Sequence, residues 1–413
     1  MTMLQSQGPR SAPVRLVEFG LALVLVAFHL GLVFSGLVSN LVSRPLHMAM
    51  ALPWILVIAA RPGLDRLTGA VLATVGIGAC LWIAINHNAL GDQYGMLSGN
   101  GQVLLASLLL AVVLEAARRA IGWPLPLVAA VALLYGLLGQ YAPGEFGHAG
   151  IPLRSYLGTL TIAEGGLWGS LTGVSVGIVA IFVIFGAVLN AGEAGQGFMN
   201  LASAAAGRLT GGAAKVSVLS SALFGSISGS ASANVASTGS ITLPAMRKLG
   251  YPKRLAAAVE AVASSGGQIM PPLMGAGAFV MVELTGVPYT GIMAAAILPA
   301  LLYFFAVWVG INAYAQRFEL APVAEEDKPT PRQVLITAAF FLVPFAALIW
   351  GMFVARYTPQ YAACLAILAG ALMLLTGADL SFDWHRSRDR IERAFLTAAR
   401  QVTMIAAIIL CAS

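Results

Sequence analysis

Charged side chains are scarce in this sequence. Asp, Glu, Lys and Arg make up 10% of its 413 residues, while 59% are hydrophobic. Soluble domains carry about 25% charged residues, so the composition excludes a soluble protein and predicts an all-α protein that crosses a lipid bilayer several times. The net charge of +6 does not indicate a nucleic-acid partner, because the basic residues cluster in short loops without interleaved aromatic side chains.

The sequence also lacks the motifs of catalytic and metal sites. Its three cysteines, Cys80, Cys364 and Cys411, lie far apart within apolar stretches, so they indicate neither a disulfide framework nor a metal site. There is no H-E-x-x-H, GKS or GKT loop, or C-x-x-C pair, and segment 225–229 has isoleucine where a hydrolase elbow needs serine. We therefore predict that the chain is not an enzyme and needs no cofactor; an intramembrane enzyme is disfavoured.

A series of apolar runs of helical length is present instead. A membrane-spanning helix needs about 20 residues. Runs of this kind lie at about 16–38, 46–60, 67–86, 101–117, 123–141, 168–190, 255–286, 291–316, 333–355, 359–377 and 396–413. Prolines, a glycine and polar residues interrupt the pattern near 142–165. We therefore predict a five-helix N-terminal unit over residues 1–150 and a second unit over residues 151–413.

One uncharged segment, from Val216 to Met246, has basic residues at both ends. These are Lys215 on one side and, on the other, Arg247, Lys248, Lys253 and Arg254. Short loops rich in Lys and Arg stay on the cytoplasmic side, so we expect both ends to lie on the same face. The segment is predicted to enter the membrane and turn back as a re-entrant hairpin, with its tip between Ser228 and Asn234. Irregular backbone at that depth is tolerated where it lines a cavity, which is typical of a transport site.

Serines and glycines crowd the predicted tip. Where two half-helices meet, positive N-terminal ends can hold a carboxylate, and free carbonyls and hydroxyls can hold a sodium ion. We assign Ser230 and Asn234 to a cation site, and Ser228, Gly229 and Ser232 to an organic-anion site. The alternative is that these side chains only serve close helix packing. That packing role is the one expected for the serines of the hairpin arms: Ser217, Ser220, Ser221 and Ser240.

The helix that follows the hairpin is predicted to break at a double proline. Pro271 removes the hydrogen bond to the carbonyl of Gly267, and Pro272 removes the one to Gln268. With Gly266 beside them, the backbone can unwind and present these carbonyls to a hard cation, so Gly266, Gly267 and Gln268 join the predicted cation site. The alternative is a proline kink made for packing, which is common in membrane helices.

Few ionisable residues fall inside the apolar runs. Glu260 lies about 10 Å into its helix, where it either pairs with the basic loop or gates the pathway. His29 stands alone on an apolar helix and is expected to be a satisfied core histidine rather than a proton relay. Ser265, just before the break, is assigned to the organic-anion site. Because no buried carboxylate is expected beside the tip and the break, we predict sodium rather than a proton as the coupling ion.

These residues resemble the large membrane subunit of TRAP transporters. The resemblance rests on the order and spacing of the segments 224–234, 243–246, 250–251, 256–258, 266–267 and 271–272. The preceding helices resemble the small four-helix subunit, fused through one extra helix as in the permeases of the TAXI branch. The resemblance implies a sodium-coupled, elevator-type importer of small organic anions in the bacterial inner membrane. It also implies a periplasmic solute-binding protein that delivers the substrate.

The resemblance further implies a second, inverted repeat with its own hairpin. No second serine- and glycine-rich hairpin occurs in the sequence, which ends at Ser413 within an apolar run. We therefore expect the sequence to be incomplete at its C-terminus and the second unit to comprise the first repeat. A passive channel or facilitator and a non-transporting membrane scaffold are the alternative functions; a scaffold would not need the broken helix.

Overall fold

The computed structural model describes residues 12–323 and 328–413. The chain divides into two units. The first holds the chain up to Ala180 together with Ala399–Ser413, and the second holds Ile181–Ala398. The boundary predicted at residue 150 lies within the first unit, and residues 399–413 join this unit from the far end of the sequence.

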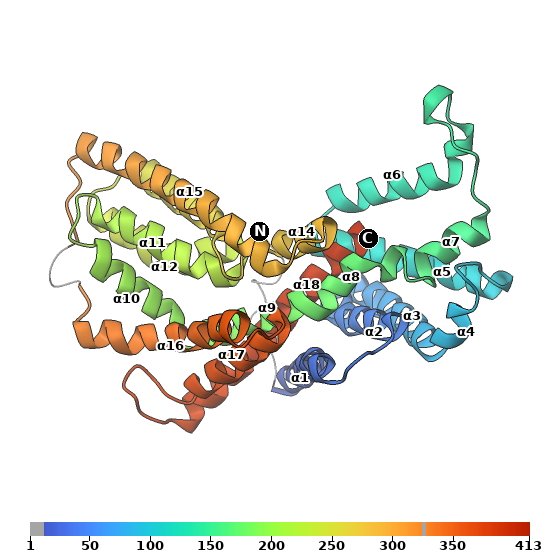
Figure 1. The fold of residues 1–413 in the computed structure, drawn as a ribbon, viewed down its shortest axis with the longest axis horizontal. Helices are drawn as coiled ribbons and strands as arrows, with labels where there is room; N and C mark the ends of the chain where they lie inside the picture. Colours follow the sequence, from blue (N-terminus) through green and yellow to red (C-terminus); the bar gives the residue numbers. More distant parts are fainter. Residues whose placement is uncertain (1–11, 324–327) are drawn as a thin grey trace. The chain divides into compact units, whose positions relative to one another are not determined.

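Helices make up the first unit, and Figure 1 draws most of them in blue to green. They are α1 (Ala12–Phe34), α2 (Asn40–Pro53), α3 (Leu64–Ile85), α4 (His87–Gly91), α5 (Gly99–Ile121), α6 (Pro124–Leu138), α7 (Leu153–Thr161) and α8 (Ser170–Val174). Short 3-10 or π-helical turns lie at Trp54–Ile58, Gly139–Tyr141, Gly144–Phe146, Gly166–Trp168 and Ser175–Val179.

The second unit is also helical. Its helices are α9 (Ala180–Ala191), α10 (Ala194–Ala206), α11 (Gly212–Ser228), α12 (Ala231–Lys248), α13 (Lys253–Gly266), α14 (Ala276–Thr285), α15 (Tyr289–Arg317), α16 (Pro331–Ile349) and α17 (Pro359–Met373). A 3-10 turn covers Gly267–Ile269, and a π turn covers Trp350–Val354. The last helix, α18 (Trp384–Ala412), begins in the second unit and ends in the first.

The prediction of an all-α polytopic membrane protein is confirmed. Among the described residues, eight helices are long and apolar enough to cross a membrane. The same residues contain no strand, only an isolated bridge between Thr376 and Phe382. Each predicted apolar run coincides with a helix or with consecutive helical segments, and at 255–286 two helices lie on either side of a break.

Besides the short helices α4 and α7, two longer helical stretches lie outside the predicted runs and the hairpin: α10 and the first part of α18. Polar residues such as Gln196 and Asn200 interrupt the apolar residues of α10, and α18 opens with Arg386, Arg390 and Arg393. A search for uninterrupted apolar runs passes over amphipathic helices of this kind, because their polar face lowers the average hydropathy.

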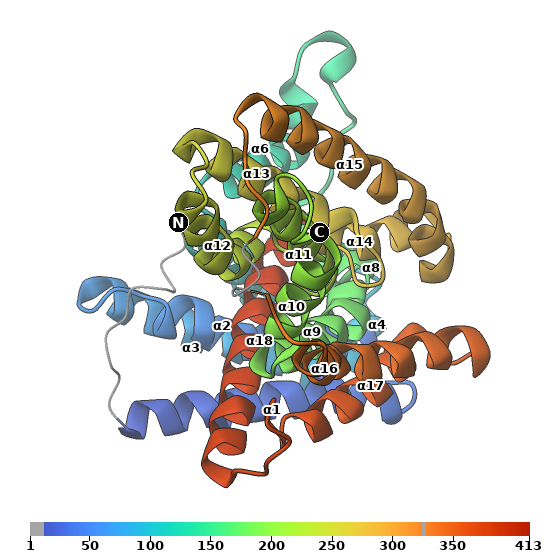
Figure 2. The same cartoon turned by 90° about the vertical axis from the view of Figure 1, so that its left-hand side faces the viewer.

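Small side chains bring the helices of the hairpin region together. α11, α12, α13 and α15 share a core that contains the buried alanines Ala213, Ala214, Ala256, Ala263 and Ala315. Small residues let helix backbones approach closely. This packing positions α11, α12 and α13 against one another (Figure 2).

Candidate functional site

The segment after α10 forms a helical hairpin. α11 and α12 lie side by side (Figure 1) and are joined by only two residues, Gly229 and Ser230. Gly229 has a φ of +59°, a left-handed conformation that glycine adopts without strain and that ends α11. Ser230 caps α12 by accepting a hydrogen bond from the backbone N–H of Ala233 at 3.4 Å. The predicted hairpin is confirmed, while its depth in the membrane stays a prediction.

The residues of the tip contact one another. The hydroxyl oxygens of Ser230 and Ser232 lie 3.2 Å apart, and the hydroxyl of Ser228 donates to the carbonyl of Ser230 at 3.4 Å. Ser228 and Ser230 are half-buried, and Ser232 is exposed. The C-terminal end of α11 and the N-terminal end of α12 therefore meet at these hydroxyls. The assignment of Ser228, Gly229, Ser230 and Ser232 to ligands stays a prediction.

The tip lies against the break in the next helix. α13 gives way to the 3-10 turn, and the helix resumes only with α14. The backbone N–H of Leu273 donates to the carbonyl of Ser226 at 3.2 Å. A Cβ atom on Gly229 would lie 2.8 Å from the carbonyl oxygen of Met274. The predicted break is confirmed, and the hairpin and the break belong to one site.

The carbonyls at the break are not free. The carbonyl of Gly267 accepts a hydrogen bond from the N–H of Met270 at 3.2 Å, and that of Gln268 accepts one from the N–H of Gly275 at 2.8 Å. The expectation that the two prolines leave these carbonyls without a donor is therefore wrong. The chain folds back on itself at the break, and its own N–H groups replace the lost helical donors. Each carbonyl oxygen has a second lone pair, so cation binding here stays a prediction.

Two glycines let the hairpin and the broken helix touch. A Cβ on Gly225 would lie 2.3 Å from the Cα of Gly267, so the two backbones are in direct contact. Beside them, the Nδ2 of Asn234 donates to the carbonyl of Ser221 at 2.8 Å and to that of Ser264 at 3.4 Å. Asn234 is fully buried. Its amide nitrogen therefore joins both arms of the hairpin to α13. This role does not depend on what the side-chain oxygen of Asn234 binds.

Glu260 lies in a buried cluster of hydroxyl groups. Its Oε2 accepts hydrogen bonds from Ser217 at 2.7 Å and from Thr242 at 2.5 Å. Its Oε1 accepts them from Thr238 at 2.5 Å and from Ser264 at 3.3 Å. Only 1% of Glu260 is exposed, and no ion pair among the described residues includes it. We call Glu260 and these four hydroxyl residues the Glu260 cluster.

Two expectations from the sequence are corrected by the Glu260 cluster. Glu260 does not pair with the basic loop; it turns toward the hydroxyls of both hairpin arms. A buried carboxylate therefore does lie close to the predicted cation site, through Ser264 and Asn234. The absence of such a group was the argument for sodium over a proton, and that argument no longer holds.

The spacing of the clustered residues was the available signal in the sequence. Residues four apart share one face of a helix. Series of this spacing are Ser217 and Ser221 in α11, Asn234, Thr238 and Thr242 in α12, and Glu260 and Ser264 in α13. Ser265, which was assigned to the site, is exposed and donates to the carbonyl of Ala261 in its own helix. Its neighbour Ser264 is the residue that reaches Glu260.

A cavity of about 640 Å³, lined by both apolar and polar residues, opens at the base of the hairpin. Its polar lining includes Gln196, Asn200, Ser203, Thr242, Lys248 and Thr337. Pockets for small molecules measure about 300–1,000 Å³, so this cavity could admit a small solute and many waters. Thr242 belongs both to the cavity wall and to the Glu260 cluster.

The first unit holds a buried histidine pair. His29 uses Nδ1 to donate to the carbonyl of Leu25 at 2.7 Å, so its Nε2 accepts from Nδ1 of His47, also at 2.7 Å. The Nε2 of His47 then accepts from the hydroxyl of Ser175 at 3.1 Å. Because a carbonyl can only accept, Leu25 fixes the tautomer of both neutral rings. The prediction of a satisfied His29 is confirmed; its partner His47 was not foreseen.

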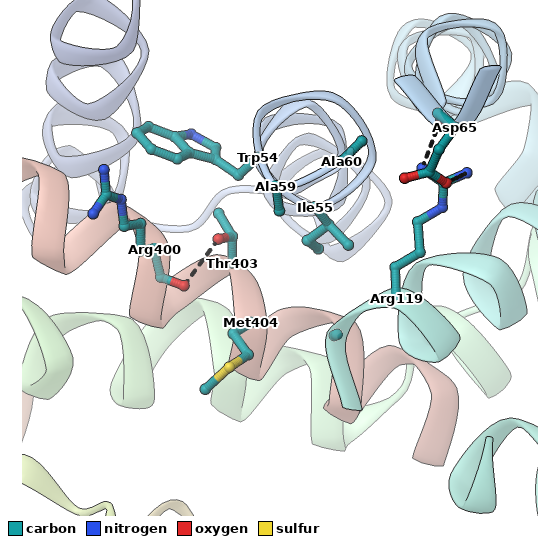
Figure 3. A pocket seen from close by; sticks show the side chains of 10 residues that line it. Trp54, Ile55, Ala59, Ala60, Asp65, Arg119, Arg400, Thr403 and Met404 are labelled. Carbon is teal, nitrogen blue, oxygen red and sulfur yellow. Dashed lines mark hydrogen bonds and ion pairs between the residues drawn. The ribbon is translucent and has the colours of Figure 1, made fainter. Parts of the chain in front are cut away.

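The first unit also contains a small pocket of about 50 Å³. Figure 3 shows Trp54 and Met404 on its wall and Arg119 paired with Asp65 beside it. A water molecule takes up about 30 Å³ in the liquid. This pocket therefore has room for one or two waters and is too small for an organic anion.

Residues 108–413 match the family described as the DctM component of the tripartite ATP-independent periplasmic transporter. Among curated proteins, an uncharacterized protein of Sinorhizobium fredii is 31% identical over 224 residues, which cover 52% of this chain and 50% of that protein.

Two relatives carry functional names. The C4-dicarboxylate TRAP transporter large permease protein of Pseudomonas aeruginosa is 27% identical over 200 residues, covering 48% of this chain and 46% of that protein. The isethionate TRAP transporter permease protein of Oleidesulfovibrio alaskensis is 29% identical over 197 residues, covering 47% of this chain and 31% of that protein. The chain spans about half the length, or less, of these curated relatives.

Proposed function

Because the chain belongs to the DctM component family of tripartite ATP-independent periplasmic transporters, we propose that it takes part in the secondary uptake of small organic anions, with sodium as the coupling ion. Family membership and eight apolar helices make it a multi-pass protein of the bacterial inner membrane. It is a transporter permease and not an enzyme, as predicted from the missing catalytic motifs.

The observation that carries the proposal is the contact between the hairpin tip and the broken helix. Opposite helix ends meet there: the last carbonyls of α11, the first N–H groups of α12 and the backbone of the break. N–H groups at a helix start favour a carboxylate or sulfonate, and neutral carbonyl and hydroxyl oxygens favour a hard cation. Anion and sodium would thus bind side by side at Ser228, Ser230 and Gly267.

The names of the relatives support organic anions as the substrates. One is named for C4-dicarboxylates and another for isethionate, and both compounds are small and anionic. By the same analogy, we propose that a periplasmic solute-binding protein delivers the substrate and that an elevator-type movement carries it across. The family match begins at residue 108; we propose that the unit predicted over residues 1–150 corresponds to a fused small four-helix subunit of the TAXI kind with its connecting helix.

Uptake into proteoliposomes tests the proposal. The full-length protein would be reconstituted and supplied with its binding protein and radiolabelled C4-dicarboxylates or isethionate. We expect accumulation that needs both an inward sodium gradient and the binding protein. Undiminished accumulation with potassium in place of sodium would contradict sodium coupling. Equilibration without accumulation would identify a passive facilitator.

The depth of the hairpin is tested by thiol labelling. Single cysteines would be placed at positions 208 and 248, before and after the hairpin, in a protein without its three native cysteines. Both positions are exposed in the structure. We expect an impermeant reagent to modify both from the cytoplasmic side. Modification of one of them from the periplasm would turn the hairpin into a simple span and remove the site from the membrane interior.

A further inference from the structure

The Glu260 cluster has fewer hydroxyl hydrogens than contacts that need one. The hydroxyl of Thr242 lies 2.5 Å from Oε2 of Glu260 and 3.0 Å from the carbonyl of Thr238. The hydroxyl of Thr238 lies 2.5 Å from Oε1 of Glu260 and 2.9 Å from the carbonyl of Asn234. Each threonine has a single hydrogen to donate, so it can serve only one of its two acceptors.

A proton on Glu260 adds one hydrogen to this network. If Oε2 carries the proton and donates it to Thr242, the hydroxyl of Thr242 becomes free to donate to the carbonyl of Thr238. The separation of 2.5 Å between the two oxygens lies within the range of O–H···O hydrogen bonds, so either oxygen can be the donor. Ser217 and Ser264 can donate to the carboxyl group in both forms. The ionised form keeps four hydroxyl donors, whereas the protonated form frees the hydrogen of Thr242 and leaves that of Thr238 shared between its two acceptors.

Among the described residues, no ion pair holds Glu260 in its ionised form. The elements packed against Glu260 are α11, α12, α13 and α15, which packs on α11 and α13. Their charged residues are Lys215, Arg247, Lys248, Lys253, Arg254 and Arg317. Lys215 lies over the ring of Trp308 at 5.0 Å, and among the described residues none of the six forms an ion pair with Glu260.

The cluster has a route to water. Thr242 lines the cavity of about 640 Å³ at the base of the hairpin. In the other direction, Ser264 and Asn234 connect the cluster to the contact between Gly225 and Gly267 at the break. Glu260 therefore lies between this cavity, which is large enough to hold water, and the site proposed for the organic anion.

From this arrangement we propose that Glu260 is a proton-binding site and that a proton travels with the organic anion, in addition to sodium. A proton from water in the cavity passes along Thr242 to Oε2 of Glu260 and leaves by the same oxygen after the transport step, so no other bond is made or broken. The gain or loss of the proton reverses the direction of the Thr242 hydrogen bond, which couples it to the hairpin arm. The transport role rests on the proposed function; proton binding does not.

Two measurements on the full-length protein separate these claims. Infrared difference spectroscopy between acidic and alkaline buffer reports the C=O band of a protonated carboxyl group without any transport. We expect a band from a buried carboxyl that disappears in Glu260→Gln and shifts in Glu260→Asp. Glu145→Gln is the matched control, because Glu145 is an exposed carboxylate in a loop and its loss should leave that band unchanged.

The second measurement follows protons during uptake with a pH-sensitive dye inside proteoliposomes. In the wild-type protein we expect acidification of the lumen with each pulse of organic anion. Glu260→Gln, which keeps the volume of the side chain, should lose this acidification while retaining exchange of labelled for unlabelled anion. Uptake without proton flux in the wild-type protein, or a proton flux unchanged in Glu260→Gln, would overturn the coupling role. An unchanged infrared band in Glu260→Gln would overturn proton binding itself, and a wild-type protein that moves no anion would count against the proposed function alone.

Discussion

The histidine pair of the first unit and the Glu260 cluster of the second are both buried polar groups, yet their hydrogens are distributed differently. In the pair, His29 donates to Leu25, His47 donates to His29 and Ser175 donates to His47. Three contacts use three hydrogens, and none is left over. In the Glu260 cluster, two threonine hydroxyls each lie between two acceptors.

This difference separates a structural network from one that can change state. A fully satisfied buried network is rigid, because every alternative leaves a polar group without a partner. A network in which a hydroxyl hydrogen has a choice of acceptors can take up a proton and rearrange. Burial and polarity are alike in the two clusters, so the count of hydrogens, and not the presence of a titratable residue, marks the second cluster as functional.

The largest effect is expected at the backbone contact between the hairpin and the break. Gly225→Ala would place a Cβ 2.3 Å from the Cα of Gly267, which a backbone can relieve only by moving α11 away from α13. We expect a loss of about 3 kcal/mol or more in the free energy of unfolding, read as a lower thermal midpoint in detergent. Gly277→Ala is the control, because nothing lies within 4 Å of a Cβ there. A tolerated Gly225→Ala would show that the helices do not touch.

A smaller loss is expected in the histidine pair. His47→Ala removes the donor to His29 and the acceptor for Ser175, and should destabilise the first unit by about 2 kcal/mol. Cys80 is fully buried in that unit. In a protein lacking the other two cysteines, the rate at which a thiol reagent modifies Cys80 therefore measures how often the first unit opens. Faster modification of Cys80 is the expected result. His47→Ala should leave the proton flux per transported anion unchanged; a change would erase the distinction between the two clusters.

The features that depend on local chemistry could be predicted from the sequence. The hairpin follows from basic residues on both sides of an uncharged segment, and the break follows from two adjacent prolines, so both could be placed without knowing what packs against them. Which N–H groups donate to the carbonyls of Gly267 and Gln268 depends on how the chain folds back after the break. Two adjacent prolines alone do not determine that geometry.

The partners of Glu260 could not be placed in this way. Which face of α13 meets the hairpin depends on the rotation of that helix about its axis, and α13 ends beside the close contact between Gly225 and Gly267. Adjacent residues point in different directions on a helix, so a small error in rotation exchanges Ser264 for Ser265. The part of the first unit formed by residues 399–413 was beyond prediction because it joins residues distant in sequence.

A change of about 1 kcal/mol is expected at the entrance to the Glu260 cluster. Thr242→Val keeps the shape of the side chain but removes a hydroxyl held 2.5 Å from Glu260, and one buried hydrogen bond contributes about 1 kcal/mol. Proton flux should slow in this variant and recover in Thr242→Ser. Thr74→Val in the first unit is the control, because that hydroxyl is exposed and donates only to the carbonyl of Ala70. Equal effects of Thr242→Val and Thr74→Val on stability would contradict a special role for Thr242.

The smallest effect is expected at Ser264, and the neighbouring residue Ser265 provides the comparison. Ser264 is buried, and its hydroxyl donates to Glu260 over the long distance of 3.3 Å, so Ser264→Ala should lower the free energy of unfolding by about 0.5 kcal/mol. Ser265 is exposed and bonds within its own helix, so Ser265→Ala should leave the free energy of unfolding unchanged.

The two variants, Ser264→Ala and Ser265→Ala, should differ in transport as well. Ser264→Ala should alter the proton flux because it removes a donor to the ionised carboxyl, whereas Ser265→Ala can act only on the organic anion. Chemical denaturation and uptake, measured on both variants, therefore decide which serine serves which ligand. A proton flux altered by Ser265→Ala and untouched by Ser264→Ala would mean that α13 is rotated relative to the hairpin and that Glu260 faces other partners than those seen here.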